Sequence, residues 1–181
     1  MSTRRTLPRA AILVGALLLG ALIFNAMADG RLTWDSVYAG IQRDWPEVPQ
    51  MNTDELARRL ASPDSRPEII DTRTQKEYAV SHLPGARWAE TTSQIHSVLT
   101  SVPTECSVVL YCSVGVRSSR AASELLHKGR GNIFNLRGSI FQWANEGRPL
   151  VREGKPVNLV HPYNSKWGTL LDPKLHSDEK R

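Results

Sequence analysis

Cys112 is the residue of this 181-residue chain best placed for covalent chemistry, because of the residues that follow it. The apolar run 108–111 ends at this cysteine, and a short loop with Gly115 and Arg117 leads into a segment with helical spacing at 120–126. Strand, tight loop and helix in this order aim backbone N–H groups at one point beyond the strand. A thiol held there ionises below its ordinary pKa of about 8.5, so we expect a nucleophilic thiolate that meets an anionic substrate.

The alternative for Cys112 is an inert core thiol, which is the common fate of free cysteines. A core cysteine needs neither the glycine nor the arginine of this loop, so the loop favours a reactive thiol. The residues expected to bind substrate are those of the loop, Ser113, Val114, Gly115, Val116, Arg117 and Ser118. Cys106 lies six residues earlier on the predicted strand, about 20 Å away, which is too far for a disulfide. We therefore expect Cys106 to be a core or strand-edge residue.

Four motifs, in order, resemble those of the single-domain rhodaneses, a family of sulfurtransferases. The loop at Cys112 has the form Cys-x-x-Gly-x-Arg-Ser. The other motifs are the strand end at 69–73, Glu77 with the segment 81–86, and the segment 136–149 with its Leu-x-Gly, Trp and Gly-x-Pro. The resemblance covers about residues 50–150. Ser81 and Ser139 stand where the family pattern has glycine. Both are expected to lie away from the cysteine and to leave its chemistry unaffected.

The resemblance implies a rhodanese-like α/β fold with a mostly parallel central sheet and helices on both faces, which the alternation of predicted strands and helices also indicates. It implies transfer of a sulfane sulfur from thiosulfate or a similar anionic donor to a thiol or cyanide, through a persulfide on Cys112 and without a cofactor. Asp71 and His82 would brace neighbouring loops, and Arg73 would hold an anion or pair with an acid. No metal is expected, because the histidines show no metal-ligand spacing.

Two other functions were weighed against sulfur transfer. A cysteine phosphatase uses a related loop with five residues between cysteine and arginine, whereas four separate Cys112 from Arg117 here. Ser118 stands where the phosphatase arginine would be, and no aspartate is evident as a general acid, so phosphoryl transfer is disfavoured. The alternative left open is a low-turnover persulfide carrier with a protein acceptor, or a thiol redox or sensing module in the periplasm.

Residues 1–28 have the pattern of an export signal. Three arginines precede an uninterrupted apolar run at 10–24, and a small-x-small sequence follows at 26–28. A helix over that run is about 22 Å long, which is short of the ~30 Å hydrocarbon core of a bilayer. We expect a cleaved signal peptide and a periplasmic or otherwise exported domain. The alternative is an inner-membrane anchor formed by residues 10–28.

Three segments follow the predicted signal. Residues 29–50 space their apolar side chains by three and four, which predicts an amphipathic helix packed on the main domain, with lipid or protein contact as the alternative. Residues 51–150 form the rhodanese-like domain. Residues 151–181 are expected to pack on it, with an end that frays from His176 onward, and their contribution to the mouth of the site stays open. Residues 29–181 hold 20 basic and 18 acidic side chains, too even a balance for a nucleic-acid partner.

Overall fold

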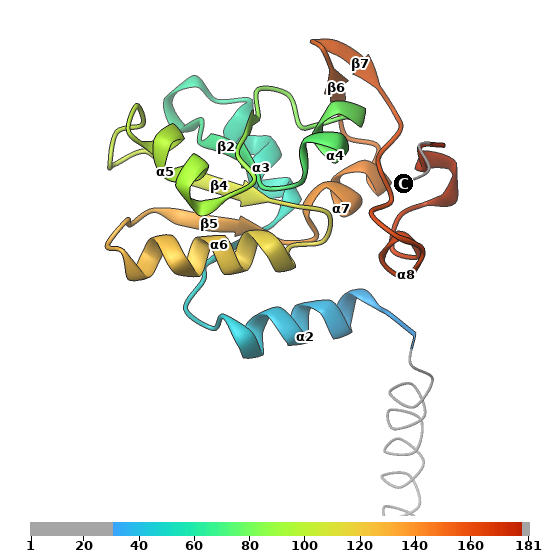
Figure 1. The fold of residues 1–181 in the computed structure, drawn as a ribbon. Helices are drawn as coiled ribbons and strands as arrows, with labels where there is room; N and C mark the ends of the chain where they lie inside the picture. Colours follow the sequence, from blue (N-terminus) through green and yellow to red (C-terminus); the bar gives the residue numbers. More distant parts are fainter. Residues whose placement is uncertain (1–30, 179–181) are drawn as a thin grey trace, which may run out of the picture. The chain divides into compact units, whose positions relative to one another are not determined.

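Five parallel strands form the central sheet of the computed structural model, which describes residues 31–178 (Figure 1). The strands are β1 (Gln50–Met51), β2 (Glu68–Asp71), β3 (Arg87–Trp88), β4 (Val108–Tyr111) and β5 (Ile133–Leu136). They lie in the order β1-β5-β4-β2-β3, and every pairing between them is parallel. The predicted α/β fold with a mostly parallel central sheet is therefore confirmed.

Helices cover both faces of this sheet. They are α3 (Thr53–Leu60), α4 (Gln75–Val80), α5 (Thr92–Leu99), α6 (Val116–His127) and α7 (Ser139–Asn145), with a short 3₁₀ helix at Pro63–Ser65. Successive residues of a strand consequently enter different cores. Val109 and Tyr111 of β4 pack in the core that contains Leu56 of α3, whereas Val108 and Leu110 pack in the other core. Burial on both faces explains why β4 is an uninterrupted apolar run instead of an alternating one.

Asn52 and Thr74 are each followed by a glutamate three residues later, a sequence pattern that predicts a helix start, and a helix begins directly after each of them. The Asn52 side chain accepts a hydrogen bond from the Glu55 N–H at 2.8 Å and begins α3. Thr74 and Glu77 form a reciprocal capping box at the start of α4, in which the Glu77 carboxylate accepts the Thr74 N–H at 3.0 Å. This capping box fixes where the Glu77 side chain lies, which matters for the site described below.

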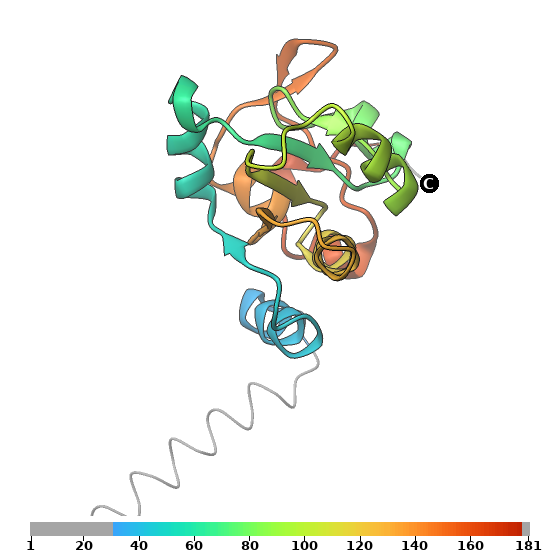
Figure 2. The ribbon, with the colours of Figure 1, turned by 90° about the vertical axis from the view of Figure 1, so that its left-hand side faces the viewer.

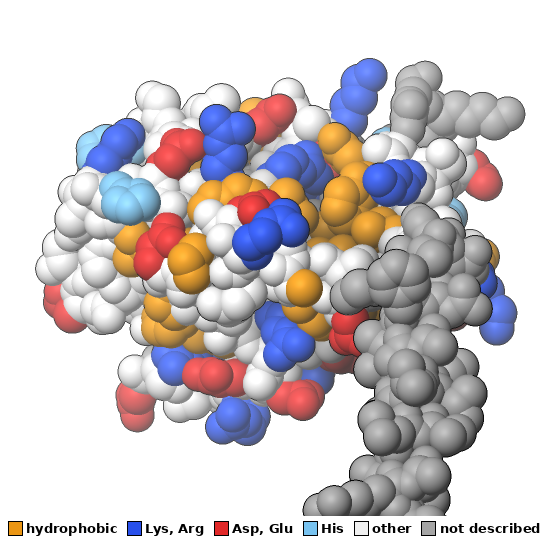
Figure 3. Space-filling view, turned by 90° about the horizontal axis from the view of Figure 1, so that it is seen from below, with side chains coloured by type: hydrophobic (Ala, Val, Ile, Leu, Met, Phe, Trp, Pro, Cys, Tyr) orange, Lys and Arg blue, Asp and Glu red, His pale blue; other side chains and the backbone are white. Residues whose placement is uncertain are grey.

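The amphipathic helix expected within residues 29–50 is α2 (Trp34–Asp44). Val37 and Ile41 on its inner face are buried in the main core, and α2 lies beside α6 in both ribbon views (Figures 1 and 2). Residues 32–178 belong to one compact unit, and this helix packs on the rest of it. Seen from the α2 side, acidic and basic side chains are interspersed (Figure 3), in keeping with the even charge balance of the sequence.

The C-terminal extension is held to the domain along most of its length. It contains a hairpin of β6 (Leu150–Arg152) and β7 (Lys155–Val157), the short helix α8 (Ser165–Gly168) and a 3₁₀ helix at Pro173–Leu175. The Asn145 side chain of α7 bonds the Leu170 carbonyl and the Asp172 N–H, both at 2.8 Å. The expected loose end is in fact fixed at its start, because the Ser177 N–H donates to the Val160 carbonyl at 3.0 Å.

Among residues 31–178, no helix is long and apolar enough to cross a membrane. The signal peptide or anchor predicted for residues 1–28 lies outside the described part of the chain.

Candidate active site

Cys112 follows the last residue of β4, and α6 begins only four residues later, at Val116. The sequence placed the helix at 120–126, so the loop is shorter than expected and Arg117 and Ser118 belong to the first helical turn. The first backbone N–H groups of a helix have no partner within the helix and carry the positive end of its dipole. The short connection therefore brings the helix end close to the sulfur.

Gly115 makes this tight connection possible. Its φ of 109° lies in the left-handed region, and a Cβ atom there would stand 3.1 Å from Asn135 Nδ2 and 3.2 Å from Ile41 Cδ1. The Gly115 N–H points back at the cysteine and donates to its Sγ at 3.2 Å. A residue with a side chain would push this N–H away from the sulfur, so the glycine serves both the turn and the thiolate.

The environment of Cys112 favours its thiolate although the residue is only 1% exposed. Burial alone raises the pKa of the thiol, because it removes water from the charged form. The Arg117 charge, together with hydrogen bonds from Ser118 and Gly115, outweighs this effect and holds the pKa below its ordinary value. This is the electropositive surrounding that distinguishes a reactive cysteine from an inert core thiol.

Arg117 is also paired with an acid. Its guanidinium donates twice to the Glu77 carboxylate, at 2.8 and 2.7 Å, and once to Ser113 Oγ at 3.0 Å. Ser113 Oγ in turn donates to Glu77 at 2.9 Å. The carboxylate is 2% exposed, and burial alone would raise its pKa, but Arg117 and the neighbouring charges and hydrogen bonds lower the pKa to about 2. Glu77 is therefore an anion at neutral pH, and it neutralises the guanidinium beside the cysteine.

A cavity of about 100 Å³ opens beside the sulfur. Its lining consists of Cys112, Ser113, Val114, Val116, Arg117, Tyr163 and Trp167. The Tyr163 ring lies over the Arg117 guanidinium, 4.7 Å from its centroid. The sequence left open whether the C-terminal extension reaches the site, and the structure places these two aromatic side chains there. Of the predicted loop residues, Gly115 and Ser118 instead contact the sulfur from the side of the helix. The expectation that Ser139 lies away from the cysteine is wrong, because its hydroxyl accepts the Cys112 N–H at 3.2 Å.

The three supporting residues lie apart from this cavity. Asp71 and Arg73 form an ion pair at 2.6 Å in which both side chains are fully buried. Of the two roles expected for Arg73, the structure therefore shows the pairing with an acid and not the binding of an anionic substrate. Arg73 also donates to the Ser81 carbonyl at 2.6 Å, which ties β2 to the end of α4. His82 stacks on the Tyr78 ring, with centroids 3.9 Å apart. Its backbone pairs with Val151 of β6, which joins the end of α4 to the C-terminal hairpin.

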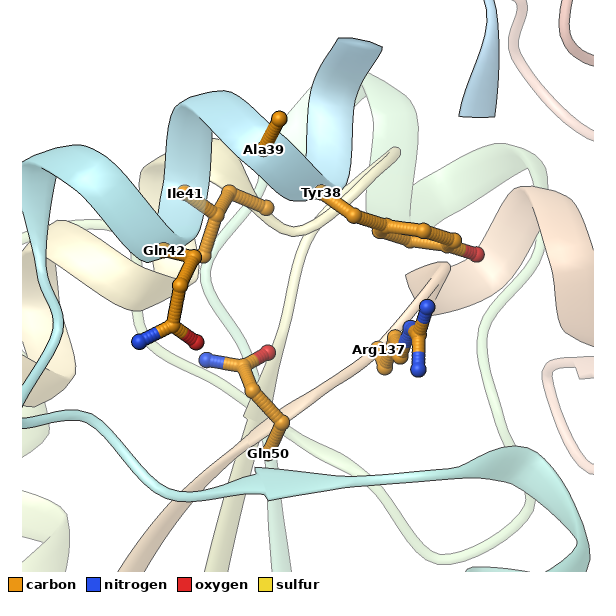
Figure 4. Close-up of a pocket in the computed structure, with 6 residues that line it drawn as sticks. All are labelled: Tyr38, Ala39, Ile41, Gln42, Gln50 and Arg137. Carbon is orange, nitrogen blue, oxygen red and sulfur yellow. The ribbon is translucent and has the colours of Figure 1, made fainter. Parts of the chain in front are cut away.

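A buried chain of polar side chains leads away from the sulfur on its other side. The Ser118 hydroxyl donates to Asn135 Oδ1 at 2.6 Å, and Asn135 Nδ2 donates to Gln50 Oε1 at 2.7 Å. Gln50 reaches a separate pocket of about 390 Å³ beneath α2, where Arg137 lies over the Tyr38 ring (Figure 4). Since a hydroxyl has one proton, donation from Ser118 to the sulfur competes with donation to Asn135.

Residues 52–146 match the rhodanese-like domain family. A sulfurtransferase from Allochromatium vinosum is 33% identical over 107 residues, which are 58% of this chain and 95% of that protein. A tRNA uridine(34) hydroxylase from Photorhabdus laumondii is 26% identical over 61% of this chain, but the match spans only 31% of that enzyme. The crystal structure of a rhodanese-like domain protein from Staphylococcus aureus superposes with a TM-score of 0.50 and 27% identity, covering 59% of this chain and 99% of that one.

Proposed function

The chain belongs to the rhodanese-like domain family, and from this premise we propose that it transfers a sulfane sulfur through a persulfide on Cys112. One observation carries the proposal: the Cys112 sulfur borders a small cavity and accepts the Gly115 N–H at 3.2 Å. Arg117, Ser118 and Gly115 also lower the pKa of the thiol, so its thiolate is more populated at neutral pH than that of an ordinary cysteine.

The proposed cycle has two halves. In the first half, the Cys112 thiolate attacks the outer sulfur of the donor, and the donor's S–S bond breaks with its electron pair on the leaving group. In the second half, a thiol or cyanide attacks the outer sulfur of the persulfide and regenerates the thiolate. Thiosulfate, the donor expected from the sequence, would release sulfite. Each state carries negative charge on sulfur, which the Gly115 N–H and the first turn of α6 stabilise.

The test is thiocyanate formation from thiosulfate and cyanide by the full-length chain. We expect Cys112→Ser to lose all turnover, because a serine hydroxyl cannot form a persulfide. Cys106→Ser is the matched control, since Cys106 lies two residues before β4, packs against the second core and does not line the cavity. Full activity of Cys112→Ser would refute the proposal.

A persulfide carrier with little turnover is the second candidate. The Cys112 side chain is nearly sealed, because Tyr163 and Trp167 help to enclose its cavity, and this favours slow exchange with small molecules. A carrier would take up one sulfur per chain and release it rapidly only to a protein thiol. Single-turnover loading followed by fast release to cyanide would exclude this candidate.

We also propose that the domain is exported, on the basis of the sequence of residues 1–28 alone. Cell fractionation with N-terminal sequencing tests this, and a full-length cytoplasmic product would contradict it.

A further inference from the structure

The charges around Cys112 do not favour a dianion. Among the described residues that line the cavity, Arg117 carries the single positive charge, and its guanidinium is bound on two nitrogens by Glu77. Once the thiolate forms, the three groups Cys112, Arg117 and Glu77 sum to one negative charge. Bringing thiosulfate, with two negative charges, up to the buried sulfur in this cavity therefore costs more than bringing in a donor with one charge.

The outer wall of the cavity is aromatic. Tyr163 and Trp167, which we call the aromatic wall, come from the C-terminal extension and lie beyond the family match at 52–146. Both are held in place: the Tyr163 N–H donates to His161 Nδ1 at 3.0 Å, and the Trp167 N–H donates to Asn164 Oδ1 at 2.9 Å.

The backbone conformation at Tyr163 also indicates that its ring is held in place beside the cavity. Its φ of 63° is in the left-handed region, which a residue with a bulky side chain rarely adopts. Strained backbone of this kind persists where the surrounding structure fixes it, and it gathers at binding sites. Here it turns the ring over Arg117, with 4.7 Å between guanidinium and ring centroid.

We propose that the aromatic wall and the Glu77–Arg117 pair select an organic sulfur donor with a single negative charge, of the thiosulfonate class, over inorganic thiosulfate. This inference rests on the proposed function and names its donor. A thiosulfonate has the form R–SO₂–S⁻, in which the R group replaces one charged oxygen of thiosulfate. The R group would lie against the aromatic wall, and the outer sulfur would face Cys112.

The reaction with such a donor is balanced without an oxidant or a proton. The Cys112 thiolate forms a new S–S bond to the outer sulfur of the donor. The donor's own S–S bond breaks, and its electron pair leaves on a sulfinate, R–SO₂⁻. The product is the Cys112 persulfide anion, so the site keeps one negative charge on sulfur throughout.

Methanethiosulfonate and thiosulfate are a matched pair of probes. They have the same number of non-hydrogen atoms, and they differ by a methyl group in place of a charged oxygen. The measurement is kcat/KM for each donor with cyanide as acceptor in the full-length protein. Because the two compounds differ in intrinsic reactivity, the informative quantity is the ratio of the two kcat/KM values in the wild type and in variants.

Two variants are expected to shift this ratio toward thiosulfate. Glu77→Gln leaves the Arg117 charge uncancelled and should shift it about tenfold at low salt, with a smaller shift at high salt. Tyr163→Ala removes apolar contact with the methyl group and should shift the ratio about fourfold. Ser165→Ala is the control, since this exposed residue of α8 does not line the cavity, and its ratio should equal that of the wild type.

The failures of the two claims are distinguishable. Turnover of both donors with the same ratio in the wild type, Glu77→Gln and Tyr163→Ala would overturn the donor inference and leave sulfur transfer intact. Turnover of neither donor by a protein whose Cys112 is free and reduced would overturn the proposed function and the donor inference together.

Discussion

Two arginine–carboxylate pairs, Asp71–Arg73 and Glu77–Arg117, lie near one edge of the sheet and differ in what they contact. Asp71 ends β2 directly beside Tyr111 of β4, so its pair with Arg73 is close to the loop of Cys112 in the fold. That pair is fully buried, and the hydrogen bonds that Arg73 donates go to the Asp71 carboxylate and to the Ser81 carbonyl. The Glu77–Arg117 pair instead borders the cavity, and its arginine side chain is 32% exposed.

The contrast shows that residue type and spacing do not decide what an arginine does. Each guanidinium binds both oxygens of a carboxylate, Arg73 through three hydrogen bonds and Arg117 through two. What separates Arg73 from Arg117 is the space that each one faces, a closed core in one case and the cysteine cavity in the other. The predictions below separate a pair that holds the fold from a pair that sets the chemistry.

The largest effect is expected at the buried pair. Asp71→Asn leaves the Arg73 charge in the core without compensation, which should lower the free energy of unfolding by about 3–5 kcal/mol. Urea unfolding at neutral pH measures this. The pH profile of the protein that remains folded should be unchanged, because neither residue lines the cavity. A loss of less than about 1 kcal/mol would show that this pair does not hold the fold.

The second effect is a fall in the free energy of unfolding at low pH, where Glu77 becomes protonated. Its pKa is about 2 in the folded protein, against ~4.3 in an unfolded chain, so the folded state binds the proton less well. Glu77 therefore contributes about 3 kcal/mol at neutral pH, and this is lost as the pH falls from about 4.3 toward 2. Urea unfolding over this range should show a shallower pH dependence for Glu77→Gln. Equal slopes for the two proteins would contradict the assignment.

The third effect is on reactivity. Removal of the guanidinium in Arg117→Gln takes away the largest influence that lowers the pKa of Cys112. The inflection in kcat/KM against pH should then move up by about one unit, which makes the reaction about tenfold slower below it. Arg120→Gln, on the exposed side of the same helix, is the control and should keep the wild-type inflection. An unchanged inflection in Arg117→Gln would show that the Arg117 charge does not lower the pKa of Cys112.

The smallest effect is expected at the first turn of α6. Ser118→Ala deletes a hydroxyl that helps to lower the pKa of Cys112, and kcat/KM should fall about fivefold, as for one lost hydrogen bond of ~1 kcal/mol. Ser119→Ala is a matched control, because Ser119 Oγ is buried without a hydrogen-bond partner among the described residues. Equal kinetics for the two alanine variants would show that the Ser118 hydroxyl does not act on the sulfur.

The sheet, the capped helices and the position of Cys112 could be predicted, since they rest on short-range patterns. The strand run before Cys112, the N-cap at Asn52 and the capping box at Thr74 are local signals. The two-residue strands β1 and β3 are too short to leave a periodic pattern. The start of helix α6 was predicted too late, because its N-cap is Gly115 in a left-handed conformation. A glycine has no side chain that could mark the helix start in the sequence.

The rest of the site depends on contacts between distant segments. Glu77 was found through its motif and its capping box, but its pairing with Arg117 spans forty residues and follows from the packing of α4 on the loop. Tyr163 and Trp167 reach the cavity because Asn145 fixes the extension to α7. Their apolar character alone predicts only that they pack somewhere on the domain.

The central claim is that sulfur is carried on Cys112. Mass spectrometry of the full-length protein after exposure to methanethiosulfonate or thiosulfate, with no acceptor present, tests it most directly. The account predicts one added sulfur atom on the peptide that contains Cys112, lost on addition of cyanide and absent from Cys112→Ser. An unmodified Cys112, or added sulfur on Cys106 instead, would contradict it.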